Sequence, residues 1–141
     1  MNNLGINEII EYAQQIKTNY AGKSVLDIIS QNNINTSYTS LNPEIYPAYT
    51  IDTGKTKAII LNSHFNVIQQ NILAAHELGH VLLHNDKVIN QFGGKNEKEE
   101  YEANLFAVAL LFDENKFNVK FNKLSNYELK YILDYNIKFN A

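Results

Sequence analysis

The sequence contains no cysteine and no arginine. Without cysteine the chain can form neither disulfides nor thiolate nucleophiles nor cysteine-based zinc sites, so histidine and carboxylate side chains are the only strong metal ligands available. All 12 basic residues are lysines scattered along the chain, and the guanidinium fork that reads guanine edges or clamps phosphate is missing. We therefore expect no direct binding to nucleic acid.

Long apolar stretches are also missing. No uninterrupted apolar run comes near the roughly 18 residues of a membrane-spanning helix, and no cationic segment followed by an apolar run resembles an export signal. We therefore expect a cytoplasmic protein with no membrane association. The 141 residues, 45% of them hydrophobic, suffice for one compact core and are too few for two, which predicts a single domain over residues 1–141.

The N-terminal half of the chain shows both helical and strand patterns. Apolar residues at helical spacing predict a helix over residues 6–20, and a second, short helix follows Ser24, a typical cap. A strand is expected near 36–40, and the β-prone runs 48–52 and 57–61 flank a glycine-containing turn typical of a hairpin. If the strand at 57–61 lies at the edge of the sheet, an extended substrate peptide can pair with it.

The C-terminal half is predicted to be helical. Capping-box pairs and apolar periodicity indicate three helices, over about 66–84, 97–112 and 125–135. The polar segment 85–96, which contains two consecutive glycines, is predicted to be a flexible connection.

One of these helices carries a metal-binding pattern, because His76, Glu77 and His80 spell H-E-x-x-H within the otherwise apolar stretch 73–84. Positions four apart are separated by about 6 Å along the helix axis and about 40° around it, so both imidazoles can bind one ion. Glu77 is turned about 100° away, where its carboxylate can meet a water on the metal rather than the metal itself. In so apolar a helix these groups are costly unless they are paired or bind a metal.

Hydrolytic zinc chemistry requires this arrangement. A zinc ion would lower the pKa of its bound water towards about 7 and polarise a carbonyl, while Glu77 would take the water's proton and pass it to the leaving amine. Gly79 supports a site, because glycine inside a helix costs about 1 kcal/mol relative to alanine but lets a neighbouring backbone or a substrate come close. The sequence therefore predicts metal-assisted amide hydrolysis, with Zn²⁺ as the metal that two imidazoles and a carboxylate suit.

A catalytic zinc site needs a third protein ligand and an open position. Four glutamates cluster at the start of the helix predicted over 97–112. Glu97, Glu99 and Glu100 have ordinary roles there, as a capping partner or as charges that suit the positive end of the helix dipole. Glu102 has none, because it lies on an apolar face where an unpaired carboxylate would be expensive. We therefore expect Glu102 as the third ligand, with Glu99 as the next candidate.

Two further histidines are expected to lie outside the ligand set. His84 lies about 6 Å further along the helix axis than His80, beyond comfortable reach of the ion. We expect it to pack against or cap the end of the helix, with a second-shell or substrate role as the alternative. His64, in a polar turn, is expected at the surface.

The segments HELGHVLLH (76–84) and EEYEANLFAVALL (99–111) resemble the ImmA/IrrE metallopeptidase family. Members of this family carry HExGH, often followed by LLH, and then an ExEANxFA segment. The likeness covers roughly residues 24–112. The Met-Pro that frequently follows the third-ligand helix in the family is replaced here by Phe112-Asp113.

The resemblance implies a small gluzincin-like α+β fold, with a short, mostly antiparallel sheet packed against the H-E-x-x-H helix and further helices. It implies His76, His80 and Glu102 as zinc ligands and Glu77 as general base. Family members typically sit beside a helix-turn-helix repressor in phages and mobile elements and relieve repression by cleaving it. We therefore expect a zinc metalloendopeptidase that acts on such a repressor.

The alternative is a protein-binding module that uses zinc structurally and inactivates the repressor by docking, without proteolysis. In that case a protein ligand would close the fourth coordination position, which a catalytic site keeps for water.

Overall fold

The computed structural model describes residues 4–84 and 96–141. Within these ranges the elements are α1 (Ile6–Asn19), α2 (Val25–Gln31), β1 (Asn35–Thr39), β2 (Ala48–Asp52), β3 (Lys57–Asn62), α3 (Val67–Leu83), α4 (Glu97–Leu111), two short 3-10 turns (Glu114–Lys116 and Phe121–Lys123) and α5 (Asn126–Phe139). The predicted helices and strands all form, and α5 continues past the predicted end near Tyr135. The predicted flexible connection lies, apart from Asn96, outside the described residues.

Four helices begin at the polar residues that the sequence marks as caps. Ser24, Asn66, Asn96 and Ser125 each accept a hydrogen bond from the backbone N–H three residues further on, at 2.8–3.1 Å. Each bond satisfies one of the backbone donors left open at a helix start. The caps therefore fix the first residues of α3 and α4, the two helices that carry the candidate site.

The sheet has the order β1-β3-β2 and is mixed. β2 and β3 form the predicted antiparallel hairpin, while β1 pairs with β3 in parallel. A mostly antiparallel sheet was expected, whereas one of the two strand pairs is parallel, because the chain reverses direction between β1 and β2 and again between β2 and β3. The hypothesis that β3 is an edge strand is wrong, because both of its sides are paired within the sheet. The edge strands are β1 and β2.

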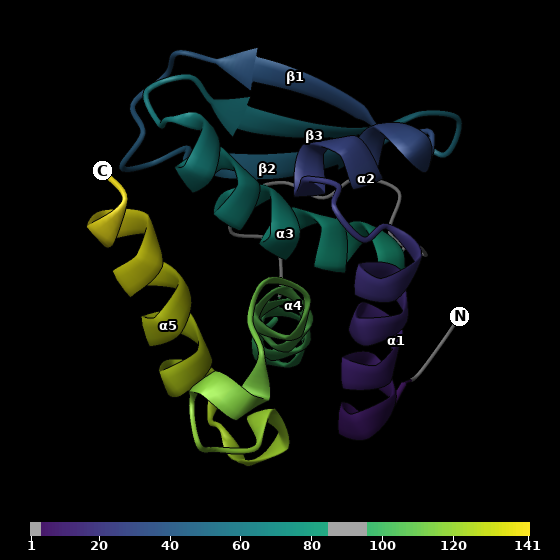
Figure 1. Cartoon of the computed structure of the whole chain (residues 1–141). Coiled ribbons are helices and arrows are strands. Elements are labelled where there is room, and N and C mark those ends of the chain that lie inside the picture. Colours follow the sequence, from purple (N-terminus) through teal and green to yellow (C-terminus); the bar gives the residue numbers. More distant parts are fainter. Residues whose placement is uncertain (1–3, 85–95) are drawn as a thin grey trace.

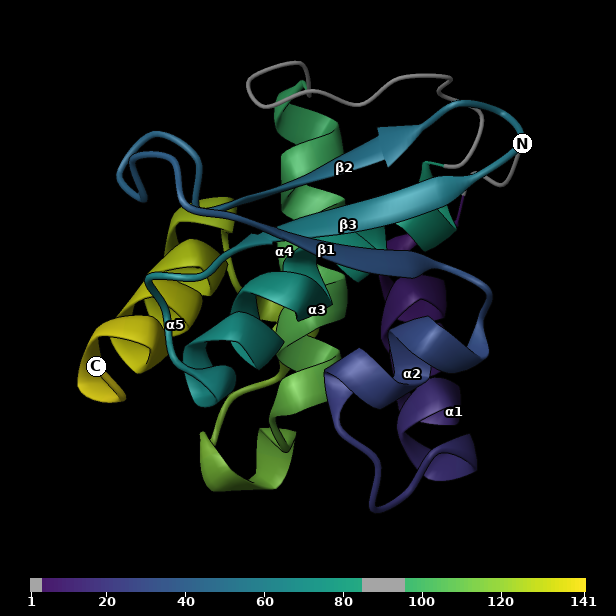
Figure 2. The same ribbon diagram turned by 90° about the horizontal axis from the view of Figure 1, so that it is seen from above.

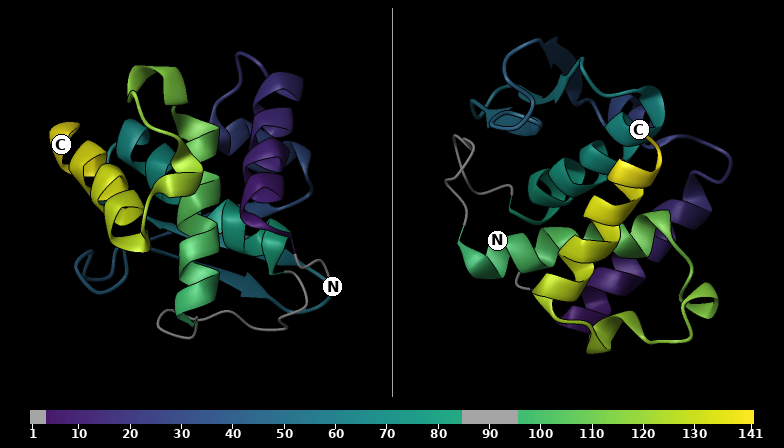
Figure 3. Two further views of the ribbon diagram at one scale, coloured as in Figure 1. Left: turned by 90° about the horizontal axis from the view of Figure 1, so that it is seen from below. Right: turned by 90° about the vertical axis from the view of Figure 1, so that its left-hand side faces the viewer.

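The sheet and the helices form layers (Figure 1). The sheet lies across one side, α3 runs beneath it, and α4 lies beneath α3 with α1 and α5 to either side. Viewed from above, α1 and α2 lie on one side of α3 and α5 on the other (Figure 2). The views from below and from the side show α4 passing between α1 and α5 (Figure 3). This architecture confirms a small α+β fold.

Helix α4 lies at the centre of the hydrophobic core. Every residue from 103 to 110 is buried, because α1, α3 and α5 all pack around this helix. A helix that is covered on all sides needs apolar residues around its whole circumference. Charged residues of α4 are confined to its first turns, which is where the candidate site lies. None of the helices in the described part of the chain is long and apolar enough to cross a membrane.

Candidate metal centre

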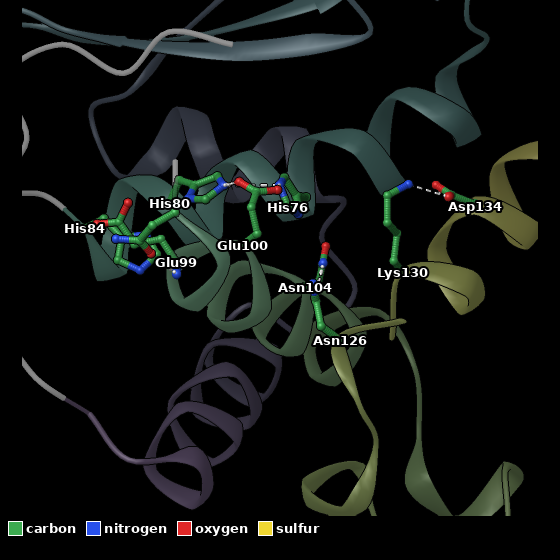
Figure 4. Close-up of polar contacts among 10 residues, drawn as sticks. His76, His80, His84, Glu99, Glu100, Asn104, Asn126, Lys130 and Asp134 are labelled. Atoms are coloured by element: carbon green, nitrogen blue, oxygen red, sulfur yellow. Dashed lines mark hydrogen bonds and ion pairs between the residues drawn. The ribbon is translucent and has the colours of Figure 1, made fainter. Parts of the chain in front are cut away.

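Two helices bring together three side chains that can bind one metal ion. His76 and His80 project from α3, and Glu100 projects from the start of α4 between them (Figure 4). The two Nε2 atoms lie 3.1 Å apart, and the Glu100 carboxylate lies 2.8 Å from Nε2 of His80 and 3.4 Å from Nε2 of His76. His80 is almost completely buried, at 1% exposure. The sequence-predicted pair of imidazoles therefore does converge.

The spacing of these atoms fits a tetrahedral ion. Bonds of about 2.0–2.1 Å at tetrahedral angles place neighbouring ligand atoms about 3.3 Å apart. The three distances within the cluster scatter around that value. The donor set, two imidazole nitrogens and a carboxylate oxygen, also suits zinc. His76, His80 and Glu100 therefore fit a zinc ion in both geometry and chemistry.

The charges within the cluster favour a cation. Burial alone would lower the pKa of His76, but the hydrogen bond to Glu100 and the negative charges of Glu77 and Glu100 outweigh it and raise that pKa. Burial alone would raise the pKa of Glu100, but hydrogen bonds to His76 and His80 hold it well below its usual value. Glu100 is therefore ionised at neutral pH and available as an anionic ligand.

The structure places Glu102 elsewhere. Its Oε1 lies 2.9 Å from Nε2 of His84, the residue that caps the end of α3. The geometry thus differs from the expected ligand set, because Glu100 occupies the position expected for Glu102. Residues two apart on a helix point about 200° away from each other, so only one of these glutamates can face both imidazoles. Glu99, the second candidate, is not a member of the cluster found among the described residues.

The sequence carries one signal that favours Glu100. Asn104 lies four residues after Glu100, on the same face of α4, and is a buried polar residue in an apolar segment. Its side chain hydrogen-bonds His76, and this contact contributes to the raised pKa of His76. Its Nδ2 donates to Oδ1 of Asn126 at 2.7 Å. The pair Glu100 and Asn104 therefore marks the face of α4 that meets the histidines.

A cleft of about 290 Å³ opens onto the cluster. Glu77, which is 8% exposed, lines it beside His76 and His80. Its other walls come from β2 and the segment before it, from α3, and from α5, and are mostly apolar. The remaining lining residues are Ile45, Pro47, Ala48, Tyr49, Thr50, Ile72, Leu73, Glu100, Asn104, Lys130, Leu133, Asp134 and Ile137. The candidate metal ligands are therefore reachable by a molecule in the cleft.

Gly79 sets the closeness of α3 and α4 at the site. A Cβ atom built on Gly79 would lie 3.2 Å from the Cα atom, and 3.2 Å from the carbonyl oxygen, of Ala103. Two of its nearest neighbours are thus backbone atoms of α4, which cannot turn away as a flexible side chain can. This confirms the expectation that Gly79 lets a neighbouring backbone come close.

We expect Gly79→Ala to weaken both folding and metal binding. Alanine gains about 1 kcal/mol in helix propensity, but overpacking against a helix backbone costs about 1–3 kcal/mol, so the net change in the free energy of unfolding is a loss of about 1 kcal/mol. Because α4 must shift, Glu100 moves relative to the histidines. Denaturant unfolding and zinc titration measure the two effects. Unchanged zinc affinity would show that the helix spacing does not set the site.

The fold and the site define a metallopeptidase-type α+β domain with two histidines of an H-E-x-x-H motif and a glutamate from a second helix. The family model described as IrrE N-terminal-like domain (Peptidase_M78) matches residues 29–138. The chain belongs to this family, as its resemblance to the ImmA/IrrE metallopeptidases predicted.

A phage protein is similar to the chain. It is the "Uncharacterized immunity region protein 2" of Bacillus phage phi105, which is 33% identical over 103 residues. The matched segment covers 70% of this chain and 64% of the phage protein, so the chain spans less than two thirds of that relative. No solved structure matched the chain.

Proposed function

We propose that the protein is a zinc-dependent endopeptidase in which His76, His80 and Glu100 hold the metal and Glu77 is the general base. The observation that carries this proposal is the convergence of the three ligands at the cleft that Glu77 also lines. Among the described residues the cluster has three members, which matches a catalytic site better than a structural site closed by four protein ligands.

Glu77 and the two histidines have different roles in the proposed reaction. A zinc ion held by His76, His80 and Glu100 would supply Lewis acidity at the cleft and make a water there more acidic. Glu77, adjacent in sequence to His76 but turned to a different direction on α3, takes a proton from the attacking water and delivers it to the amine of the leaving peptide. His76 and His80, held on one helix, would fix the metal at the cleft, so that a bound substrate meets it in one orientation.

We propose that the substrate lies along β2. This strand is at the edge of the sheet, and its residues Ala48, Tyr49 and Thr50 line the cleft. An extended peptide can add to such an edge through backbone hydrogen bonds. The apolar walls contributed by Leu133, Ile137 and the segment before β2 then favour an apolar side chain near the scissile bond.

We further propose a helix-turn-helix repressor as the target. The name of the similar Bacillus phage protein refers to an immunity region, which supports a role in repressor regulation. Cleavage of the repressor would relieve repression, in agreement with the resemblance to the ImmA/IrrE family.

Incubation of the purified protein with the helix-turn-helix repressor encoded nearest to it tests the function. We expect two repressor fragments, whose masses locate the cleaved bond. We also expect cleavage to stop when a zinc chelator is added and to return when zinc is restored. Relief of repressor activity with the repressor left intact would favour the docking module instead.

The exposed residue Ile45 tests the role of the apolar cleft. It lies at the cleft and is 58% exposed, so serine in its place has little effect on folding. Loss of an apolar contact worth about 1.5 kcal/mol is expected to lower kcat/KM about 10-fold, mainly through KM. Leu41→Ser is the matched control, because Leu41 is 53% exposed in the same connection before β2 but does not line the cleft. Equal effects of the two substitutions would contradict this substrate position.

A further inference from the structure

We infer that Glu102 and His84 position His80 for metal binding through a hydrogen-bond chain that joins the start of α4 to the end of α3. The Nδ1 atoms of His80 and His84 lie 3.0 Å apart, and Nε2 of His84 lies 2.9 Å from Oε1 of Glu102. Both imidazoles are buried, at 1% and 3% exposure. The hydrogen-bond chain therefore runs from the carboxylate of Glu102, through the ring of His84, to Nδ1 of His80, the ring nitrogen that faces away from Glu100.

The carboxylate of Glu102 determines which atoms donate and which accept along this hydrogen-bond chain. An ionised carboxylate can only accept hydrogen bonds, so Nε2 of His84 must carry a proton to bond Glu102. In a neutral His84 the other nitrogen, Nδ1, is then an acceptor. It can bond Nδ1 of His80 only if that atom carries a proton. The hydrogen-bond chain therefore needs no proton on Nε2 of His80, and this nitrogen can give its lone pair to a metal ion in place of its contact with Glu100.

Glu102 thereby selects the tautomer of His80 that can bind a metal. If His84 carried its proton on Nδ1 instead, its Nε2 would present a lone pair to the Glu102 carboxylate. The hydrogen bond between these two residues would then be lost. A buried acceptor without its donor costs about 1–3 kcal/mol, so the metal-binding tautomer is strongly favoured. Glu102 and His84 are positioning residues, because neither has an atom in the metal cluster.

The two candidate ligands of α3 are held in matching ways. Asn104 hydrogen-bonds the ring of His76, and in the proton arrangement argued above His84 accepts a hydrogen bond from His80. Partners of this kind fix the ring orientation of a metal-binding histidine and increase its basicity. The cost of placing Glu102 on the buried face of α4 is thus offset by His84 rather than by the metal.

Zinc affinity and the protonation of His80 test this inference, which rests on the proposed metal site but not on proteolysis. We expect Glu102→Leu and His84→Phe each to weaken zinc binding about 10- to 100-fold in competition with a chromogenic chelator. Because both residues act through the same contact, the double variant is expected to bind zinc no more weakly than the single His84→Phe variant. Glu102→Gln keeps an acceptor oxygen and is expected to lose less affinity than Glu102→Leu.

Nitrogen NMR of the metal-free protein gives a readout that a purely structural role would not change. We expect Nδ1 of His80 to carry a proton in the wild type and to lose that proton in part in Glu102→Leu, whichever state the contact with Glu100 gives Nε2. Glu97→Leu is the matched control, because it removes an exposed carboxylate from the first turn of the same helix. Thermal unfolding of each variant without zinc shows whether it folds, and Glu102→Gln serves if Glu102→Leu does not.

Wild-type zinc affinity and an unchanged His80 tautomer in folded Glu102 and His84 variants would overturn the inference. A wild-type protein that binds zinc but cleaves no repressor would contradict the proposed proteolysis and leave the inference intact. A wild-type protein that binds no zinc would contradict both, although the NMR result would still report whether Glu102 sets the tautomer.

Discussion

Glu77→Gln is expected to lower kcat/KM for repressor cleavage by about 10²- to 10⁴-fold, which is the usual contribution of a general base. Glutamine has nearly the same shape as glutamate but cannot accept the proton of the attacking water. Its amide leaves His76, His80 and Glu100 in place, so the zinc content is expected to stay at the wild-type level. Initial cleavage rates and elemental analysis of the same preparations measure the two quantities.

Two comparisons make the Glu77 experiment decisive. Ile45→Ser, which changes the cleft but not the proton transfer, is expected to act mainly on KM, whereas Glu77→Gln acts on kcat. Circular dichroism and thermal unfolding confirm that the glutamine variant is folded, as Glu77 is a buried residue. If this variant retains zinc and cleaves the repressor at the wild-type rate, Glu77 is not the base.

Glu100→Gln is expected to weaken zinc binding by well over 100-fold, more than the roughly 10- to 100-fold loss expected when an outer hydrogen-bonding partner is removed. The substitution removes the anionic ligand from a cluster in which Glu100 contacts both imidazoles. A competition titration against a chromogenic chelator gives the dissociation constant. Because the metal is lost, cleavage is expected to fall to background at zinc concentrations that saturate the wild type.

Glu102→Gln provides the comparison for Glu100, since both residues are glutamates near the start of α4 and both substitutions remove one charge. The ranking of the two losses identifies the third ligand. A greater loss of zinc affinity in Glu102→Gln than in Glu100→Gln would contradict the arrangement of α4 and restore the ligand set expected from the sequence.

The elements that form the fold could be predicted because their signals are local. Capping residues such as Ser24, Asn66 and Ser125 place polar oxygens within reach of N–H groups three residues away, so the sequence alone indicates where a helix begins. The hairpin of β2 and β3 follows in the same way from a short turn between two β-prone runs. The parallel pairing of β1 with β3 joins segments far apart in the chain and carried no local signal.

The sequence predicted the two histidines of the candidate site but did not distinguish Glu100 from Glu102 as the third ligand. Reasoning from the cost of a buried carboxylate correctly required a partner for Glu102, but it could not distinguish a metal from His84. The same reasoning assigned Glu100 to the helix dipole, because an ionised residue in a first turn needs no further explanation. Both side chains satisfy local rules, and the rules do not state which one reaches His76 and His80 and which one reaches His84.

The sequence by itself determined that His76, Glu77 and His80 share one helix at a spacing that suits a metal and a base, because helix geometry fixes positions four residues apart. Only the tertiary structure decided which glutamate completes the cluster, because that depends on how α4 is rotated against α3. The rotation is set by contacts between the helices, such as the approach of Ala103 to Gly79, which the spacing of residues along either helix does not contain.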